Sequence, residues 1–524
     1  MTSLSVRPVR ALKCQTPKRP WLTGLTLKST VALLLSFATA DAKSIKVAVN
    51  TWPPAMGNPY SQQIQGAVHP FVGLFDGLTF MDQDGRTLPR LAVSWTADSP
   101  TVWTFKLRPG VSFSNGEPFN AAAVVAMIEM LKAPEGQRFF YAQEVENIVS
   151  VKAVDDLTVV ITTAKPDVIL PKRLSLLTPT PPKYWRDVGP DGFTQKPIGT
   201  GPFTIDSWGR DRGKYVMEAT DTSWRPSKHL RRIEFRILQE APRRVQALEI
   251  GEIDLTYSIG YEDMKPLDAA GFRIVVNRIP TALAIALPNT HPNSPLNDVR
   301  VRKALNMAVD RDTIATQLLL GTVKPSAHGI EKGVFGYNPE IAAYPYDPAR
   351  AKALLTEAGY GDGFSINAAV LAIATTDGAA IFQRVAQDLA AVGVKLNMRS
   401  VLGTEWVQMW TSGDWKGADA LSSNWNGASY MDAGRAVESY TCARPGPFFC
   451  APEVEKLLAQ SNVEFDEAKR EKQLQQALAL LHDLAPSIYL FPQTEIMALS
   501  KDVLNTPFRG RFLDWGEVDV AEAP

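Results

Sequence analysis

The sequence predicts an α/β protein built from more than one folding unit. Its 524 residues exceed what a single hydrophobic core usually supports. Residues 71–131 contain short runs of alternating apolar and polar side chains separated by turns, a pattern typical of a β-rich module. Residues 230–259 then follow the order strand, helix, strand. That alternation favours a mixed α/β layer beside the β-rich module.

The N-terminal segment has the pattern of an export signal. Six basic residues precede an apolar run over residues 31–37, and an Ala-Asp-Ala motif ends at Ala42. This order predicts a secretory signal peptide over residues 1–42, cleaved near Ala42; the alternative is an uncleaved N-terminal helix. The apolar run is too short for a permanent membrane anchor. Cleavage would change the formal net charge from zero to about −5, which disfavours binding to nucleic acid or anionic membranes.

A strand, two turns and a helix follow one another in the β-rich module. The odd-numbered residues from Trp103 to Leu107 are apolar and their neighbours are polar, as expected for a strand with one buried face. Pro-Gly at 109–110 and Asn-Gly at 115–116 predict chain reversals. Asn120 is predicted to cap the next helix, because its side-chain oxygen can accept an unpaired backbone N–H.

Longer helices are predicted in the second half of the chain. Asp298 and Asp347 stand at helix starts, where a carboxylate can cap free N–H groups. Apolar residues recur at helical spacing over residues 381–389 and 474–481. A strand-like segment at residues 394–398 follows the first of these helices. Alternating helices and strands therefore continue toward the C-terminus.

Several long segments together resemble the family 5 extracellular solute-binding proteins, the capture subunits of peptide/nickel-type ABC importers. The segment "LRPGVSFSNGEPF" and the preceding "GLFDGLTFMDQDGRTLPRLAVSW" are similar to the family's opening hairpin, turn and helix. "PIGTGPFTIDSW" resembles its next strand pair, with Phe203 where tyrosine is more usual. "PLNDVRVRKALNMAVDR" and "LAPSIYLFPQ" follow in family order. The resemblance covers nearly the whole chain after the predicted leader.

This resemblance implies a two-lobed periplasmic binding protein fold, type II-like and of cluster C, with an extra β-rich subdomain in the first lobe. The implied first lobe consists of four segments: 43–57, 58–185 (the extra subdomain), 186–288 and 490–524. The implied second lobe is residues 289–489. The two crossings between the lobes, near residues 286–290 and 489–493, would be hinge strands.

One turn-rich stretch holds four candidate ligand-binding residues, Trp425, Asn426, Tyr430 and Asp432. In peptide-binding relatives a carboxylate in this region receives the ligand's α-ammonium group, and Asp432 is the matching position. The surrounding residues depart from the Asp-Pro-Asp form of those relatives, which leaves peptide specificity open. Two alternatives remain: Asp432 caps the helix that follows it, and Trp425 belongs to the core.

A second stretch, Asn50, Thr51 and Trp52, directly follows a short apolar strand predicted over residues 45–49. Ligands of α/β proteins collect beyond the carboxyl ends of strands, so these three residues are also candidate ligand contacts. The alternative is a surface loop shaped by its prolines. Trp406 and Trp410 lie four positions apart on a predicted helix, a spacing more typical of a packing stripe than of a ligand site.

Cysteine and histidine usage indicates structural rather than catalytic roles. Cys442 and Cys450 remain after the predicted cleavage, and an oxidising compartment favours a disulfide between them. Closing so short a loop would stabilise the fold by about 2.5 kcal/mol. A metal or redox pair is the alternative. The sequence lacks a G-x-S-x-G elbow, a phosphate-binding loop and an H-E-x-x-H pair, so we predict no catalytic residue, no metal site and no cofactor.

The residues and the resemblance together predict a periplasmic receptor, not an enzyme, that binds a small organic solute and closes its lobes around it. A short peptide or peptide-like molecule is the expected ligand, and an inner-membrane ABC permease is the expected partner of a soluble monomer. On the same scaffold the ligand could instead be a nickel chelate, an opine or an oligosaccharide. A secreted hydrolase is an alternative of another class, and a chaperone or signalling receptor is a third.

Overall fold

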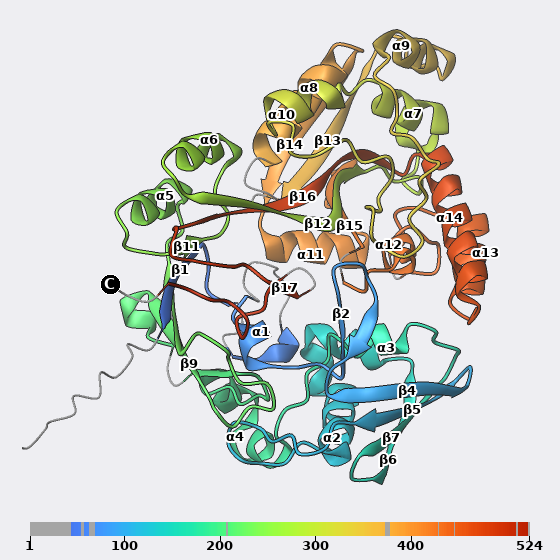
Figure 1. The fold of residues 1–524 in the computed structure, drawn as a ribbon. Coiled ribbons are helices and arrows are strands. Elements are labelled where there is room, and N and C mark those ends of the chain that lie inside the picture. Colours follow the sequence, from blue (N-terminus) through green and yellow to red (C-terminus); the bar gives the residue numbers. More distant parts are fainter. Residues whose placement is uncertain are drawn as a thin grey trace, which may run out of the picture. The chain divides into compact units, whose positions relative to one another are not determined.

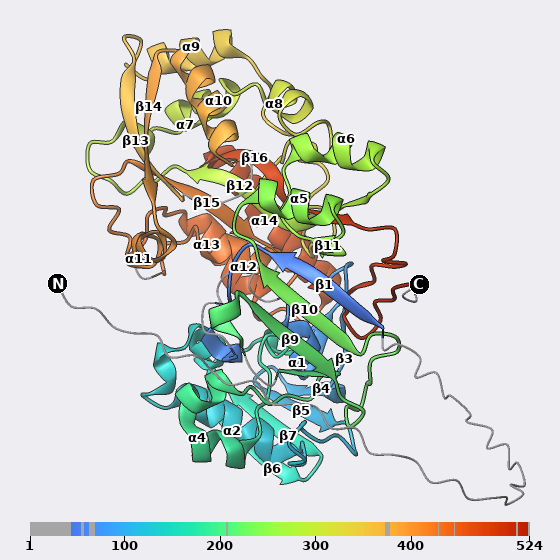
Figure 2. The same ribbon diagram turned by 90° about the vertical axis from the view of Figure 1, so that its left-hand side faces the viewer.

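The computed structural model describes residues 43–53, 57–61, 69–205, 208–371, 378–427, 429–444, 446–509 and 512–521. The predicted signal peptide and its cleavage site near Ala42 lie outside these residues. Figures 1 and 2 show the arrangement of the elements in two views.

A ten-stranded mixed sheet forms the centre of the fold, with the strand order β14-β13-β15-β12-β16-β11-β1-β10-β9-β8 (Figures 1 and 2). Its strands, in chain order, are β1 (Ser44–Val49), β8 (Phe203–Ile205), β9 (Lys214–Ala219), β10 (Arg232–Ile237), β11 (Leu255–Thr256), β12 (Arg273–Ala286), β13 (Phe364–Leu371), β14 (Val394–Val401), β15 (Ala420–Asn426) and β16 (Ser487–Leu499). β1 is parallel to its neighbours β10 and β11, whereas β12 is antiparallel to β15 and β16. Segments far apart in the sequence therefore share one sheet.

Several helices begin at a residue whose side chain caps the first turn. The α-helices are α1 (Phe71–Leu74), α2 (Ala121–Lys132), α3 (Leu170–Arg173), α4 (Pro182–Gln195), α5 (Ala241–Glu249), α6 (Tyr261–Ala269), α7 (Val299–Met307), α8 (Arg311–Gln317), α9 (Pro348–Glu357), α10 (Gly378–Ala390), α11 (Gly403–Ser412), α12 (Ala433–Glu438), α13 (Pro452–Ser461) and α14 (Glu467–Leu484). Short 3-10 helices are η1 (Pro59–Ser61), η3 (Gly136–Arg138), η4 (Phe140–Val145), η5 (Arg210–Arg212) and η6 (Pro295–Asn297). The predicted caps are confirmed, since Asp298 accepts the Arg300 N–H and Asp347 the Arg350 N–H, each at 2.8 Å.

The predicted β-rich module is a separate four-stranded sheet in the order β4-β5-β7-β6. Its strands are β4 (Ala92–Ser99), β5 (Val102–Leu107), β6 (Ile148–Asp155) and β7 (Thr158–Thr163), and α2 packs against β6 and β7. Trp103, Phe105 and Leu107 are buried, which confirms the alternation read from the sequence. Asn120 accepts the Ala123 N–H at 3.3 Å and caps α2 as predicted. The hairpin β2 (Thr79–Met81) and β3 (Thr87–Pro89) precedes this sheet.

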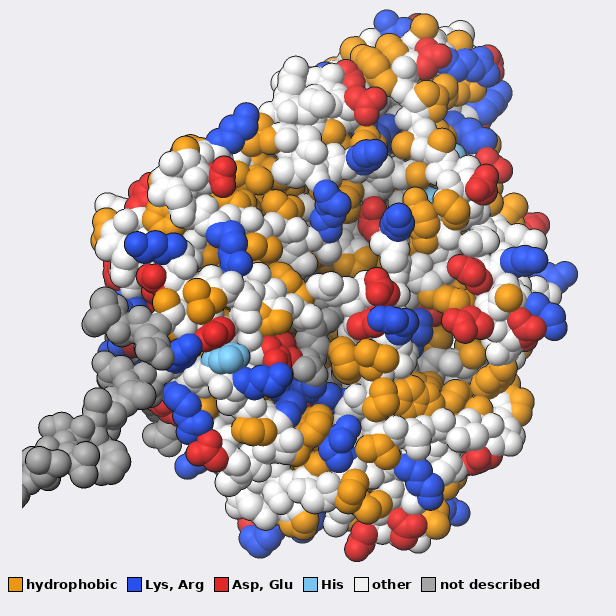
Figure 3. Space-filling model, in the orientation of Figure 1, with side chains coloured by type: hydrophobic (Ala, Val, Ile, Leu, Met, Phe, Trp, Pro, Cys, Tyr) orange, Lys and Arg blue, Asp and Glu red, His pale blue; other side chains and the backbone are white. Residues whose placement is uncertain are grey.

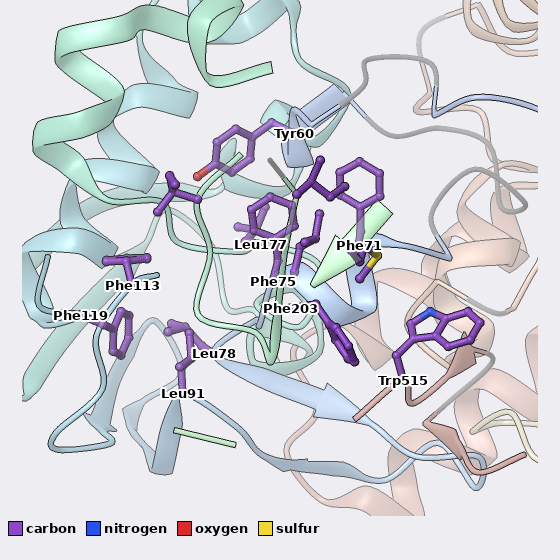
Figure 4. Close-up of a cluster of buried hydrophobic side chains, with 14 of the residues drawn as sticks. Tyr60, Phe71, Phe75, Leu78, Leu91, Phe113, Phe119, Leu177, Phe203 and Trp515 are labelled. Atoms are coloured by element: carbon purple, nitrogen blue, oxygen red, sulfur yellow. The ribbon is translucent and has the colours of Figure 1, made fainter. Parts of the chain in front are cut away.

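Buried apolar side chains form clusters on both sides of the long strands. One cluster joins the β-rich module to β1, β9 and β10, and Figure 4 shows aromatic side chains such as Tyr60, Phe75 and Phe203 packed within it. Trp515, near the C-terminus, belongs to the same cluster. The predicted apolar stripes of α10 and α14 are buried in two further clusters, one for each helix. Most residues of these clusters come from the second half of the chain. The short strands β17 (Phe508–Arg509) and β18 (Phe512–Leu513) pair with each other near the C-terminus.

Two of the predicted segment boundaries fall within regular elements. The boundary between residues 185 and 186 lies inside α4, and the boundary between residues 489 and 490 lies inside β16. Helix α4 contains a kink at Gly189, whose φ of 66° is readily adopted only by glycine, so the chain changes direction a few residues after the expected place.

Candidate functional site

A strip of polar side chains crosses the long strands β12, β15 and β16. Asn277 on β12 lies opposite Glu495 on β16, and two positions further the register pairs Ile279 with Gln493. The Gln493 side-chain amide donates to Asn424 Oδ1 on β15 at 2.8 Å. The β12–β16 register shifts directly after Ile279, and from this point β12 pairs with β15 on its other side. The strip therefore lies where the pairing of β12 with its neighbouring strands changes.

The carboxyl ends of the parallel strands β11 and β1 lie beside this strip. Tyr257 directly follows β11, and its N–H donates to the Ala48 carbonyl of β1 at 3.3 Å. Asn50, Thr51 and Trp52 directly follow β1, at the same edge of the sheet. All three are partly exposed. Their position matches the place where ligands collect in α/β proteins, and the assignment of these residues as ligand contacts stays a prediction.

The side chains of Trp52 and Thr51 have local partners. The Trp52 ring centre lies 5.7 Å from that of Tyr215, and the Thr51 hydroxyl donates to the Trp52 carbonyl at 3.2 Å. These contacts order the loop after β1, and both residues remain partly exposed.

Three buried side chains meet at the inner end of the strip. His69 stacks on the ring of Tyr257, with 3.9 Å between ring centres, and His69 Nε2 lies 3.0 Å from Glu495 Oε1. All three are less than a tenth exposed. Trp515 fixes the backbone here by donating to the His69 carbonyl at 2.8 Å. We call His69, Tyr257 and Glu495 the buried polar cluster.

Asp432 is the N-cap of α12, as one of the two sequence readings predicts. Its Oδ1 accepts the Gly434 N–H at 3.0 Å. Arg470 on α14 donates to both carboxylate oxygens at 2.7 and 2.8 Å, and Lys172 Nζ lies 3.2 Å from Oδ2. The side chain is completely buried. Burial alone would raise the pKa of Asp432, but the attraction of Arg470 and Lys172 outweighs it and lowers the pKa to about 2.

Tyr430 connects the same region to the β-rich module. Its hydroxyl donates to Glu144 and accepts from Arg173 Nη1 at 3.2 Å, and its ring lies beneath the guanidinium groups of Arg173 and Arg435. Burial, followed by the charge of Glu144, raises the pKa of the Tyr430 hydroxyl far above its usual range. Lys172 and Arg173 are consecutive residues of α3, so one short helix reaches both Asp432 and Tyr430. We call the contacts of Lys172 with Asp432 and of Arg173 with Tyr430 the α3 contact.

Trp425 has the surroundings of a core tryptophan, the alternative reading of the sequence. Its ring is 1 % exposed and stacks on Tyr440 with 3.9 Å between ring centres. Its indole N–H donates to Ser487 Oγ at 3.1 Å. The indole occupies the space that a Cβ would need at Gly329. Asn426, one residue further, is exposed and donates to Ser429 Oγ at 2.7 Å within a turn.

The two tryptophans of α11 form the predicted packing stripe. The rings of Trp406 and Trp410 are stacked with 5.4 Å between centres, and the Trp406 indole N–H donates to the Ser422 carbonyl at 2.7 Å. The predicted disulfide between Cys442 and Cys450 is present. Among the described residues, no group of three or more His, Cys, Asp and Glu side chains is placed to hold a metal ion.

A cavity of 680 Å³ lies away from the polar strip, between the β2–β3 turn, residues 332–339 and α14. Charged side chains of both signs line it, among them Arg86, Lys172, Lys332, Glu467 and Glu471. Figure 3 shows acidic and basic side chains next to one another on this face, over the elements labelled β2 and α3 in Figure 1. None of the predicted ligand-binding residues lines this cavity.

Comparison with known families identifies the scaffold. The profile of the bacterial extracellular solute-binding proteins, family 5 (middle), matches residues 86–446. The chain belongs to this family. In the described ranges, no helix has the length and apolar character that crossing a membrane requires.

Curated relatives and solved structures agree with the family assignment. This family 5 protein is 28% identical to the glutathione-binding protein GsiB of Salmonella typhimurium over 388 residues, 73% of each chain. Its fold is similar to that of NikA from Brucella suis in complex with Fe(III)-EDTA, with a TM-score of 0.79 at 23% identity, covering 91% of this chain and 100% of NikA. It is also similar to the periplasmic binding protein DppA from Helicobacter pylori in complex with the peptide STSA, with a TM-score of 0.77 at 21% identity, covering 92% and 98%. The predicted periplasmic binding protein fold is thereby confirmed.

The sequence reading of this family 5 protein did not single out the polar strip or the buried polar cluster. The sequence assigns histidines structural roles only, and Tyr257 belongs to no motif that predicts a site. One signal is present in the sequence: Gln493, Thr494 and Glu495 interrupt the mostly apolar β16, and Gln493 and Glu495 are two positions apart. In a strand this spacing places both on one face of the sheet.

Proposed function

We propose that this protein is a periplasmic receptor that binds a short peptide or peptide-like molecule at the polar strip and delivers it to an ABC permease in the inner membrane. The observation that carries the proposal is the Gln493–Asn424 hydrogen bond beside the register shift of β12 and β16. It joins polar side chains on strands that lead into different parts of the fold. Amide side chains in such a place can hydrogen-bond the backbone amides of a peptide.

The family and its relatives support this ligand class. GsiB, at 28% identity, is named a glutathione-binding protein, and glutathione is a tripeptide. Family membership supports export to the periplasm as a soluble monomer, with a signal peptide cleaved near Ala42 and a permease partner. Asn50, Thr51 and Trp52 would contact the ligand from the carboxyl end of β1.

Binding would be coupled to hinge closure. We assign residues 43–288 and 490–524 to the first lobe, with 58–185 as its extra subdomain, and residues 289–489 to the second. β12 and β16 are then the hinge strands. A ligand that contacts both lobes only in the closed state shifts the equilibrium toward closure. In this scheme the α3 contact, which joins the extra subdomain to the second lobe, belongs to the closed state, and Tyr430 and Asp432 act by holding it.

The test is thermal unfolding of the secreted protein after denaturation and refolding have removed any bound molecule. Glutathione and a mixture of tripeptides are compared with a nickel chelate, an opine and an oligosaccharide. A ligand present at 100 times its Kd stabilises the folded state by about 2.7 kcal/mol, so Tm rises with ligand concentration. A rise with peptides alone is expected. A rise in Tm only with the chelate, opine or sugar would show that the ligand is of that class and not a peptide. No rise with any of these compounds would contradict the receptor proposal.

A further inference from the structure

The buried polar cluster contains hydrogen-bonding atoms that the fold does not use. His69 Nδ1, Tyr257 OH and Glu495 Oε2 are buried and have no hydrogen-bond partner. The side chains that carry them are 1 %, 2 % and 8 % exposed. Leaving a buried polar atom without a partner destabilises a fold, so such atoms are rare. Three of them on side chains in mutual contact indicate a place that a further molecule completes.

The charge of Glu495 makes this cluster unlike other buried sites of the protein. Every other fully buried Asp or Glu among the described residues forms an ion pair with an arginine. These are Asp76, Glu144, Asp167, Asp388, Asp432 and Asp514. Within the described ranges, the ion-pair partner of Glu495 is the imidazole of His69, and no arginine or lysine pairs with it. Where this fold buries a carboxylate for structural reasons it supplies a guanidinium, and at Glu495 it does not.

The position of Glu495 connects it to the polar strip. It lies on β16 opposite Asn277 and two residues from Gln493, so the three side chains follow one another across the hinge strands. Asn277, Gln493 and Asn424 are half-buried, whereas Glu495 is buried. A peptide lying along the strip would therefore meet amide groups along its length and a carboxylate at one end.

We propose that Glu495 Oε2 binds a primary ammonium group of the ligand, with His69, which contacts Oε1, as its positioning residue. This proposal rests on the proposed receptor function. An ammonium carries three N–H donors and a full positive charge, and it would supply the counter-charge that Glu495 lacks. An ionised carboxylate only accepts hydrogen bonds, so His69 Nε2–H donates to Oε1 and fixes the orientation of Oε2. The Tyr257 hydroxyl and His69 Nδ1 remain available for other polar atoms of the ligand or for water.

The binding experiment compares glutathione and trialanine with their N-acetylated forms on the secreted protein and on Glu495→Gln. Wild type is expected to bind the free amines at least tenfold more tightly than the acetylated forms. Glu495→Gln should bind both forms equally, since the amide has lost the charge. Equal affinity in wild type, or preserved discrimination in Glu495→Gln, would overturn the subsite and leave the receptor proposal intact. If neither form binds wild type, both proposals are wrong.

Ligand-free stability gives an independent readout with a matched control. Asp76 is a buried carboxylate that accepts from Arg90 at 2.6 Å and from Arg225 at 2.9 Å, so Asp76→Asn should lower the urea midpoint clearly. Glu495→Gln removes a buried carboxylate that pairs with no arginine or lysine among the described residues, and its urea midpoint should equal or exceed that of wild type. A loss as large as that of Asp76→Asn would mean that Glu495 has a structural role, and would overturn the proposal.

Discussion

Asp432 illustrates how one side chain can fit two readings of the sequence. A carboxylate directly before a helix suits an N-cap, and the family resemblance suggests a contact to a ligand ammonium. In the structure both carboxylate oxygens have protein partners, from Gly434, Arg470 and Lys172. A ligand ammonium would have to displace Lys172 to reach it. Glu495 differs from Asp432 in that, among the described residues, it pairs with the imidazole of His69 and with no arginine or lysine.

Neutralising Asp432 should destabilise the protein strongly. Asp432→Asn leaves Arg470, which is 4 % exposed, without its counter-charge, and breaking a buried ion pair costs about 3–5 kcal/mol. The free energy of unfolding is measured by urea titration. Asp298→Asn is the control, because Asp298 caps α7 at a partly exposed position and asparagine caps a helix as well as aspartate. A loss below about 1 kcal/mol in Asp432→Asn would contradict the role assigned to the pair.

The low pKa of Asp432 predicts an acid-dependent part of the stability. The pKa is about 2 in the folded protein, against about 3.9 in an unfolded chain. Because folding lowers this pKa, the contribution is fully present above pH 4 and is lost as the pH falls toward 2. The difference in unfolding free energy between wild type and Asp432→Asn should therefore shrink from pH 5 to pH 3. A difference that stays constant over this range would show that another interaction explains the effect of the mutation.

At the scale of elements, α3 has a role beyond its four residues. Lys172 donates to Asp432 and to the Met431 carbonyl, and its ammonium lies 5.2 Å from the ring centre of Phe335. Arg173 meets Glu144 and Asp167 within the β-rich module as well as Tyr430. This short helix thus forms charged contacts both with the β-rich module and with residues 430–432. If the lobes open as proposed, these are the contacts that opening must break.

Removing one of these contacts should weaken ligand binding without touching the ligand. Lys172→Ala is expected to raise the Kd of a bound peptide roughly fivefold or more, because it destabilises the closed state to which the ligand is coupled. Isothermal titration calorimetry measures the change. Lys183→Ala is the matched control, since Lys183 pairs with Asp187 on the exposed face of α4 and should leave Kd unchanged. An unchanged Kd in Lys172→Ala would show that the α3 contact does not contribute to closure of the lobes.

At the scale of the whole molecule, the sequence predicts local structure well and the meeting of distant residues poorly. The strand from Trp103 to Leu107 and the cap at Asn120 depend on neighbours within a few positions, and both are confirmed. Tyr257 and Glu495 meet because β11 and β16 are neighbours in the sheet and Tyr257 directly follows β11, while His69 comes from the segment before α1 and stacks on Tyr257. Periodicity fixes the buried face of a strand, not its neighbours in the sheet. The β16 polar residues therefore suggest a site in the sequence, and the sheet order supplies its other members.

Hinge closure makes a prediction for the molecule as a whole. If a bound peptide contacts the strip on β12, β15 and β16 and the closed state gains the α3 contact, as proposed, ligand should lower the radius of gyration in solution. Small-angle X-ray scattering on the refolded, ligand-free protein, before and after addition of a peptide that raises its Tm, measures this change. Lys172→Ala should have a larger radius of gyration at subsaturating peptide, because more molecules stay open, and should approach wild type at saturation. If peptide raises the Tm while the radius of gyration stays constant in both proteins, the ligand binds to a structure that is already closed, and β12 and β16 do not act as a hinge.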